Sequence, residues 1–544
     1  MPRPPRRLPE PRAMIVAPQP EAVEAGADML RSGGNALDAA LACAFAQGVV
    51  DPMMCGLGGL GVLHILDPRR GEPIVYDGLS PCPRAARETM WEALYEGECS
   101  DGYGYRVTGA LNELGHQAVT VPAILRAFAD AHAAHGRMPW RALFAAAIPL
   151  AAEGWMVRPH VHTMFTAEER AYGRRNMVEK LGYTAEGAAL YLRPDGTPKR
   201  PGDMVRNPAL AATLGNIAEG GAEAFYSGAI ARGIAEDMAR NGGLVTLEDL
   251  AAVTVPRVAP LSVPYRGYTL LLPPPPAGGI VVAEILRILE RFDLAALGHN
   301  SADYVAVLAE AMKIAGRDKD RHIGDPAFVP PPLELLLGDA YADACAARIR
   351  AGERVTLARA APESRDTTTI SCVDADGMVV SITHTLGLPS GVIPPGTGFM
   401  LNGAMNWYDP RPGRASSIGP GKRRFSSMAP MMVMQDGRPV ATLGAPGGAW
   451  IGIAIAQAVV NLLDWGMTMQ EAVMAPRISA TAETIDLSNR IPRAVEAALE
   501  AKGYATKRYP IGFAFAAVHG ITLYDGRLEG GADPQRDGYA AGVA

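Results

Sequence analysis

A chain of 544 residues, of which 48% are hydrophobic and 20% charged, can bury a large core and is too long for one small domain. Its 51 basic and 57 acidic residues give a net charge of -6, and no basic stripe is interleaved with aromatic residues, which argues against nucleic-acid binding. We therefore expect a soluble globular protein whose partners are small polar or neutral molecules.

The N-terminal residues 1–14 are rich in arginine and proline, and no apolar run follows them. Because the apolar core of a secretory signal is missing, we predict a disordered tail and a cytoplasmic protein. The next stretch, 21–50, predicts two helices that are separated by Gly33 and Gly34. The second helix is apolar on nearly all sides, which indicates that it is buried.

Segments rich in alanine and leucine predict further helices as far as about residue 350. Residues 367–373 and 378–386 are β-branched and alternating, with a turn sequence between them, which predicts a β-hairpin. Residues 438–448 predict a strand that enters a glycine loop. Residues 450–465 predict a buried helix that is too short to cross a membrane. Strands and helices occur in blocks, which indicates layered sheets with helices outside.

Several motifs that suggest other functions are better explained by packing. The glycine spacing at 56–61 has neither a strand before it nor a helix after it, so it predicts a tight turn rather than a dinucleotide site. The pairs His132/His135 and His160/His162 have metal-like spacing, but no third ligand accompanies either pair. We expect neither a metal nor another cofactor. The six cysteines show no ligand spacing and are expected to be core thiols.

The stretch ESRDTTTIS places three threonines in a row behind an Arg-Asp pair. Taken alone, a threonine run favours an ordinary strand, since threonine is common in sheets. A threonine hydroxyl becomes an effective nucleophile when the residue is the first of a chain, because its α-amine, with a pKa near about 8, accepts the proton. An internal threonine can act in this way only if the chain is cut before it.

The surrounding sequence resembles the γ-glutamyltransferase (γ-glutamyl transpeptidase) family of N-terminal nucleophile hydrolases. The resemblance runs from Ile15 to the C-terminal stretch GGADPQRDGYAAG and rests on the order and spacing of several motifs. These include SGGNALDAA, VDPMMCGLGG, AVTVPAILRAF, VPYRGYTLLLPPPPAGGI, ESRDTTTIS, KRRFSSMAP and LGAPGGAWI. The resemblance implies an α+β fold of four layers, αββα, in which two stacked antiparallel sheets are flanked by helices.

The same resemblance implies a proenzyme that cuts itself between Asp366 and Thr367. Residues 15–366 would form a large, mostly helical subunit and residues 367–544 a small subunit, and the two would remain one intertwined structural unit. Thr367 matches the nucleophile, whose hydroxyl attacks the Asp366 carbonyl to give an ester that water hydrolyses. Pairing of two such units into a dimer of heterodimers is left open.

Further family functions map onto single residues of this chain. Thr385 matches a threonine that positions the nucleophile. Gly447 and Gly448 match the backbone N–H pair of an oxyanion hole, where glycine lets the backbone approach the substrate closely. Ser426 and Ser427 match a serine pair that binds a substrate carboxylate.

Four positions depart from the family where it binds the amino-acid head of a γ-glutamyl group. The replacements are Leu79 for an arginine, Gly387 for an asparagine, Ala404 for a glutamine and Trp407 for an aspartate. Because a desolvated charge without a partner costs several kcal/mol, a zwitterionic γ-glutamyl group is poorly matched. Relatives with this catalytic core include cephalosporin acylases and an oxamate amidohydrolase, whose acyl groups carry a carboxylate and no α-amine.

We therefore predict a self-processing amide hydrolase for a small amide whose acyl group bears a carboxylate, held by Ser426, Ser427 and either Arg84 or Arg423. One alternative is a γ-glutamyl hydrolase or transpeptidase that acts on glutathione or other γ-glutamyl amides. An alternative of another class is an uncleaved, non-catalytic binding protein. No nucleic-acid or membrane partner is expected.

Overall fold

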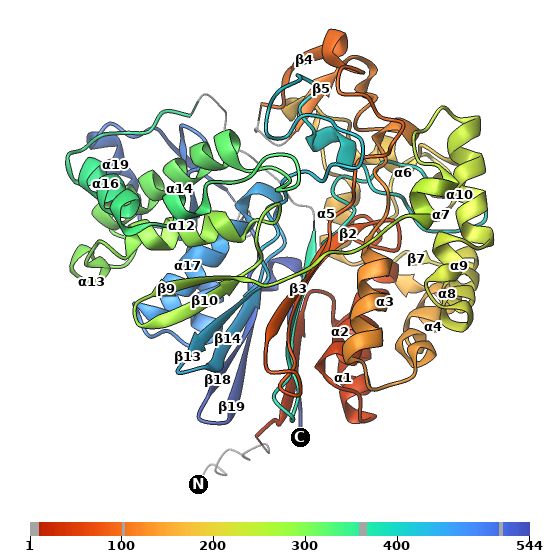
Figure 1. Cartoon of the computed structure of the whole chain (residues 1–544), viewed down its shortest axis with the longest axis horizontal. Coiled ribbons are helices and arrows are strands. Elements are labelled where there is room, and N and C mark those ends of the chain that lie inside the picture. The colour runs from red at the N-terminus through yellow and green to blue at the C-terminus, as the bar shows by residue number, and fades with distance from the viewer. Residues whose placement is uncertain (1–9, 101–103, 358–366, 511–514) are drawn as a thin grey trace.

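Two antiparallel sheets lie face to face at the centre of the molecule, with helices on both outer sides (Figure 1). The structure is a computed structural model that describes residues 10–100, 104–357, 367–510 and 515–544. The layer order is αββα, and the predicted α+β fold class is confirmed.

Both sheets combine strands from the two segments that the sequence predicts as subunits. Over the described residues, the first sheet has seven strands and the second has six, and neighbours in each run antiparallel. In spatial order, the first sheet contains β20 (Tyr539–Val543), β1 (Ala13–Ala17), β11 (Thr368–Val373), β12 (Val379–Thr385), β2 (Leu60–Leu66), β3 (Pro73–Gly78) and β8 (Arg257–Val258). The second contains β19 (Arg527–Ala532), β18 (His519–Tyr524), β14 (Arg438–Gly444), β13 (Met431–Gln435), β10 (Tyr268–Leu272) and β9 (Leu261–Tyr265).

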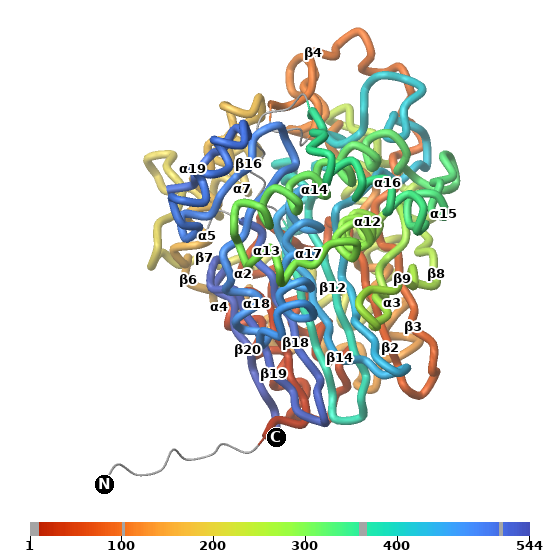
Figure 2. The backbone as a smooth tube through the Cα atoms, turned by 90° about the vertical axis from the view of Figure 1, so that its left-hand side faces the viewer, coloured from red at the N-terminus to blue at the C-terminus, as the bar shows by residue number. Residues whose placement is uncertain are grey.

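Each sheet is covered by its own group of helices (Figures 1 and 2). The first sheet packs against α1 (Pro20–Arg31), α2 (Ala36–Val50) and α3 (Ile124–His135). The second sheet lies under α12 (Gly279–Leu289) and α17 (Ile451–Leu463), which contact α14 (Ala302–His322), α16 (Asp339–Arg350) and α18 (Met469–Met474). Outside α2 and α3 lie α4 (Ala147–Glu153), α8 (Pro208–Gly220), α9 (Glu223–Tyr226) and α10 (Ala229–Arg240).

The predicted pair of N-terminal helices is present as α1 and α2. Gly33, in the break between them, has φ of +89°, a conformation that favours glycine. The Asn35 side chain caps α2 and forms a capping box with Asp38. Nearly all of α2 is buried, because it lies between the first sheet and outer helices. Its apolar character on all sides therefore indicated its position correctly.

Three smaller predictions can be compared with the structure. Residues 1–9 of the predicted tail lie outside the described residues, but Ala13 and Met14 already belong to β1, so the ordered strand begins earlier than predicted. The glycine motif at 56–61 is a turn into β2, in which a Cβ at Gly59 would lie 2.3 Å from the Thr385 carbonyl oxygen. All six cysteines are buried and free, as predicted.

Among the described residues, no helix combines the length and apolar character that a bilayer crossing requires.

The predicted hairpin is formed by β11 and β12, and its side chains alternate between two faces. The Thr369 and Thr383 hydroxyls lie 3.2 Å apart, and a Cβ at Gly444 of the second sheet would lie 2.3 Å from Thr369 Oγ1. Ile370 and Ile382 join the apolar core on the helix side. Alternate threonines of the run therefore face the space between the sheets.

Strand register fixes the position of Thr367 in the fold. Met14 pairs with Val373 at the end of β11, and Ala13 pairs with Val543 near the C-terminus. The end of β11, the start of β1 and the end of β20 therefore lie at one end of the first sheet. Thr367 precedes the start of β11, so it lies at the opposite end.

Candidate active site

Thr367 contacts Thr385, the last residue of β12. The Thr367 hydroxyl donates a hydrogen bond to the Thr385 hydroxyl at 3.3 Å. The Thr385 hydroxyl also accepts the backbone N–H of Gly387 at 2.9 Å. Both threonine side chains are almost fully buried. The hairpin thus brings together the predicted nucleophile and the threonine predicted to position it.

The backbone of Thr367 is strained. Its φ is +94°, in a region that β-branched residues rarely adopt. Such a conformation costs on the order of 1–3 kcal/mol and persists only where the surrounding structure enforces it. The Thr367 carbonyl is held by a hydrogen bond of 2.9 Å from Arg536 Nη1. Asp366, the other residue of the predicted cleavage site, lies outside the described residues.

Arg536 belongs to a buried charged group beneath Thr367. It follows β19 and is only 6% exposed. The carboxylate of Asp51, at the end of α2, lies close enough for its charge to interact with that of Arg536. Burial raises the pKa of Asp51 to about 7, although Arg536 opposes the rise. Neither residue was predicted from the sequence to belong to the site.

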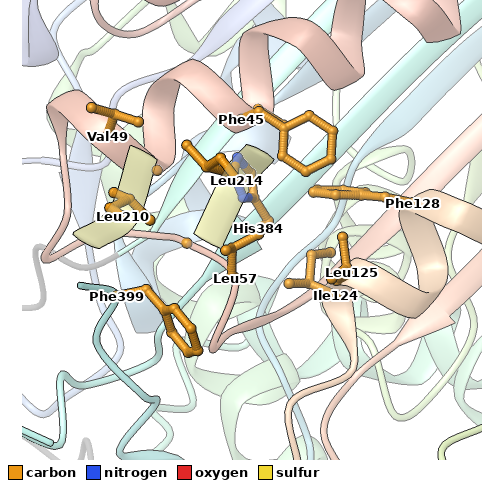
Figure 3. A pocket seen from close by; sticks show the side chains of 13 residues that line it. Phe45, Val49, Leu57, Ile124, Leu125, Phe128, Leu210, Leu214, His384 and Phe399 are labelled. Atoms are coloured by element: carbon orange, nitrogen blue, oxygen red, sulfur yellow. The ribbon is translucent and has the colours of Figure 1, made fainter. Parts of the chain in front are cut away.

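On the helix side of the hairpin, Gln47 of α2 supports Thr368. The Gln47 amide donates to Thr368 Oγ1 at 3.0 Å, and its carbonyl oxygen lies 2.9 Å from His384 Nε2. His384 lines a cavity of about 20 Å³ together with Phe45 and Phe128 (Figure 3). Because the other residues that line it are apolar, this cavity belongs to the packing of the core and not to the reaction site.

Buried histidines should make the folded state sensitive to acid. Burial lowers the pKa of His64 to about 4, and the pKa values of His384 and His519 to about 3. In the unfolded chain the histidine pKa is about 6.5, so the unfolded state binds more protons below that pH and stability falls as the pH falls. We expect urea titrations to show a loss of up to roughly 1.4 kcal/mol per pH unit for each histidine. A His384→Gln variant should show a shallower dependence, and an unchanged slope would contradict this explanation.

Gly447 and Gly448 connect β14 to the short helix η7 (Gly448–Trp450), which continues into α17. Gly447 has φ of +137° and Gly448 has φ of +53°. A Cβ at Gly447 would lie 2.4 Å from the Cβ of Ala516, so no larger residue fits there. The first N–H groups of a helix lack partners within it and attract negative charge. This position suits the predicted oxyanion contact.

Ser426 and Ser427 lie just before β13 and pack closely on the loop before α12. The Ser426 N–H donates to the Pro276 carbonyl at 2.8 Å, and a Cβ at Gly278 would lie 2.4 Å from the Ser427 carbonyl oxygen. Ser426 is buried, whereas Ser427 is half-buried and lines a cavity of about 520 Å³. The serine pair is therefore fixed by backbone packing, and Ser427 lies at the wall of a large cavity.

This cavity is the candidate substrate pocket. Its wall includes Ser427, Trp407 and Ala449, the residue after Gly448, so it borders three predicted site segments. Five cationic side chains and three carboxylates line it, which favours an anionic ligand. The cations are Lys319, Arg321, Arg411, Arg414 and Arg424, and the carboxylates are Glu98, Asp320 and Asp409.

The four positions that depart from the family lie together. Leu79, Ala404 and Trp407 belong to one buried apolar cluster. A Cβ at Gly387 would lie 2.8 Å from the Trp407 ring, so the fourth position contacts the same cluster. The four replaced positions therefore form one continuous apolar group.

The two arginines that sequence analysis offered for a substrate carboxylate are engaged elsewhere. Arg423 forms ion pairs with Asp77 at 2.5 Å and with Asp325 at 3.2 Å. The Arg84 side chain is 65% exposed and lies 3.9 Å from Asp249. Neither residue is among the described residues that line the cavity, so this prediction is corrected.

Of the two neighbours Arg423 and Arg424, it is Arg424 that lines the cavity. Its guanidinium carbon lies 3.3 Å from the centroid of the Trp407 ring. Arg424 could not be predicted from the sequence because Arg423 and Arg424 are chemically identical neighbours, and only the fold determines which of the two faces the cavity.

The histidine pairs form local contacts. His132 Nε2 lies 2.9 Å from the Met138 carbonyl oxygen, and His135 lies 3.0 Å from an Asp67 carboxylate oxygen. His162 Nδ1 lies 2.9 Å from a backbone carbonyl. Within the part of the chain that the structure describes, no group of three or more potential ligands is arranged to hold a metal ion.

Comparisons with known proteins cover almost the entire chain. The family described as Gamma-glutamyltranspeptidase matches residues 22–543. The chain is 39% identical over 543 residues to the acylase ACY 1 proenzyme of Pseudomonas sp. (strain V22), covering 98% of this chain and 94% of the relative. It is 33% identical over 546 residues to the glutathione hydrolase proenzyme of Escherichia coli (strain K12), covering 96% and 90% respectively.

A solved structure shares the fold. The crystal structure of cephalosporin acylase from Bacillus halodurans matches with a TM-score of 0.86 and 28% sequence identity, over 99% of this chain and 98% of that chain. The two relatives compared by sequence are both named proenzymes. One is named an acylase and the other a glutathione hydrolase. The residues around the pocket are therefore needed to decide which type of substrate suits this chain.

Proposed function

The chain belongs to the gamma-glutamyltranspeptidase family, and from that membership we propose that it is a proenzyme that cuts itself before Thr367 and then hydrolyses an amide with the freed threonine. The family and the fold support an amide hydrolase of the N-terminal nucleophile class. The observation that carries the proposal is the hydrogen bond between the Thr367 and Thr385 hydroxyls at the end of the hairpin.

Processing and turnover use the same hydroxyl. In processing, Thr367 Oγ attacks the Asp366 carbonyl carbon, the peptide nitrogen leaves as the new α-amine, and water hydrolyses the resulting ester. In turnover, the α-amine takes the hydroxyl proton while Oγ attacks the substrate amide, and passes it to the leaving amine. Water then hydrolyses the acyl ester. The Gly447 and Gly448 N–H groups hold the oxyanion, and loss of one such donor typically costs about a hundredfold in rate.

The two products of processing stay joined. Both central sheets contain strands from before and after residue 366, and β11 lies between β1 and β12. Separation of the chains would expose these paired edges to water. We propose that the mature enzyme consists of both chains in one structural unit.

The proposed acyl group bears a carboxylate and lacks an α-amine. The apolar cluster of Leu79, Ala404 and Trp407 offers an α-ammonium no charged partner, and the cations around the cavity repel it. Ser427 lies at the wall, where its hydroxyl can donate to an anionic ligand. The second candidate, a γ-glutamyl hydrolase or transpeptidase, is favoured by the glutathione hydrolase relative.

Two chromogenic substrates that differ only in the α-amine separate these candidates. We expect kcat/KM for glutaryl-p-nitroanilide to exceed that for γ-glutamyl-p-nitroanilide by about tenfold or more, since one unmatched charge costs at least about 1.4 kcal/mol. Absorbance of released nitroaniline gives both rates. Faster hydrolysis of the γ-glutamyl compound would favour the second candidate. Intact mass of the purified protein tests the self-processing step.

A further inference from the structure

We propose that Arg424, stacked on Trp407, binds the carboxylate at the far end of the substrate acyl group and thereby sets the acyl specificity. This inference rests on the proposed function. It identifies the acyl group as one half of a dicarboxylic acid and assigns its recognition to a residue for which sequence analysis gave no role.

A continuous series of contacts connects the nucleophile to Arg424. The Thr367 hydroxyl contacts Thr385 at 3.3 Å, and the Thr385 hydroxyl accepts the Gly387 N–H at 2.9 Å. Gly387 lies directly against the Trp407 ring, and its lack of a side chain makes this approach possible. The guanidinium of Arg424 lies 3.3 Å from the centroid of that ring. Arg424 is therefore connected to the reacting hydroxyl through contacts with only three intervening residues.

The stacking orients the guanidinium for carboxylate binding. A guanidinium carries five N–H donors in one plane, in a fork that matches a carboxylate. Arg424 lies over the face of the Trp407 indole, and one of its donors is bonded to the Phe425 carbonyl. Stacking occupies the flat face of the guanidinium, so its N–H groups point outward in the plane of the group and not toward the indole. Arg424 is only 7% exposed, and it lines the cavity, so the site is built before the ligand arrives.

Ion pairs with carboxylates of the same wall hold three of the other four cations of the cavity, namely Arg411, Arg414 and Lys319. Arg411 forms two hydrogen bonds of 2.8 Å with Asp409. Lys319 forms an ion pair with Asp320 at 2.6 Å. These pairs neutralise one another, whereas Arg424 adjoins the aromatic residue that replaces the family's aspartate. Arg424 is therefore better placed than these three paired cations to select an anionic acyl group.

The same position explains the exclusion of an α-amine. In the family pattern, an aspartate at position 407 holds the ammonium of the substrate, as the resemblance implies. Here Trp407 supplies a π-face, and that face is already covered by the cation of Arg424. An ammonium would meet a positive charge instead of a negative one. Where the family has a negative aspartate, this chain has Trp407 with the positive Arg424 stacked on it. This position therefore favours an anionic group of the substrate instead of a cationic one.

The test compares an anionic substrate with a neutral one in charge-altered variants. Arg424→Met removes the charge and keeps much of the side-chain length, and Arg424→Lys keeps the charge but loses the fork. For Arg424→Met we expect KM for glutaryl-p-nitroanilide to rise about thirtyfold, with kcat/KM for butyryl-p-nitroanilide changed less than about threefold. Arg424→Lys should be intermediate. Arg84→Met, an exposed arginine away from the cavity, is the matched control and should leave both substrates unaffected.

The outcomes separate this inference from the proposed function. If the wild type neither cleaves itself nor hydrolyses either anilide, the proposed function fails. If it does both and Arg424→Met alters both anilides equally, the role of Arg424 is refuted while the function stands. An inhibition measurement on the wild type tests the same inference without a variant, so its result does not depend on whether Arg424→Met folds. Free glutarate should inhibit butyryl-p-nitroanilide hydrolysis at least about tenfold more strongly than butyrate, and equal inhibition would also refute the inference.

Discussion

Purified wild-type protein is expected to consist of two chains separated between Asp366 and Thr367, whereas Thr367→Ala should remain one chain of 57.3 kDa. Alanine has no hydroxyl to attack the preceding carbonyl, so no ester can form. The strain at Thr367, with its φ of +94°, is relieved when the residue becomes a chain terminus, which favours cleavage in the wild type. Intact mass spectrometry measures the result directly.

Two further variants sharpen this result. Thr367→Ser keeps the hydroxyl and should still cleave. Thr385→Val removes the hydroxyl that contacts Thr367 and leaves the Gly387 N–H without its acceptor, so cleavage should slow by about tenfold or more. The Thr367→Ala chain should also lack amide hydrolysis, because both nucleophile and base are lost. If wild type and Thr367→Ala both stay whole after long incubation, the non-catalytic binding protein becomes the better explanation.

The sequence predicted those parts of the fold that depend on local patterns. The β11–β12 hairpin followed from β-branched alternation around a turn, and the burial of α2 followed from its apolar faces. The alternation also accounts for the threonine run, in which Thr369 faces the second sheet and Thr368 faces Gln47 of α2. Such features are fixed by periodicity, so one segment of sequence suffices to predict them.

Contacts between distant segments were not predictable in this way. Arg423 and Arg424 are adjacent and identical, and the fold directs one toward Asp77 and Asp325 and the other toward Trp407. The family resemblance identified four replaced positions but not that they share one apolar cluster. Each of these facts depends on which loops the two sheets bring together.

Arg536 is another residue that only the fold connects to the site. Replacing it with methionine should slow cleavage at Thr367 by about tenfold or more and destabilise the folded chain. Arg536 donates to the Thr367 carbonyl, and its charge also compensates that of Asp51. Loss of one partner of a buried charge pair costs about 3–5 kcal/mol. Because removal of Arg536 raises the already elevated pKa of Asp51 further, the destabilisation should be larger at pH 8 than at pH 6.

The double variant Arg536→Met/Asp51→Asn separates the two roles of Arg536. Asparagine removes the buried charge, so most of the lost stability should return, as urea unfolding in the Thr367→Ala background would measure. The Thr367 carbonyl still lacks its donor, so cleavage followed by intact mass should remain slow. Asp51→Asn alone should cleave at nearly the wild-type rate, because Arg536 still holds the carbonyl. If the double variant recovered both stability and fast cleavage, Arg536 would act only as a counter-charge. A stable but slow double variant would mean that Arg536 positions Thr367 for its attack.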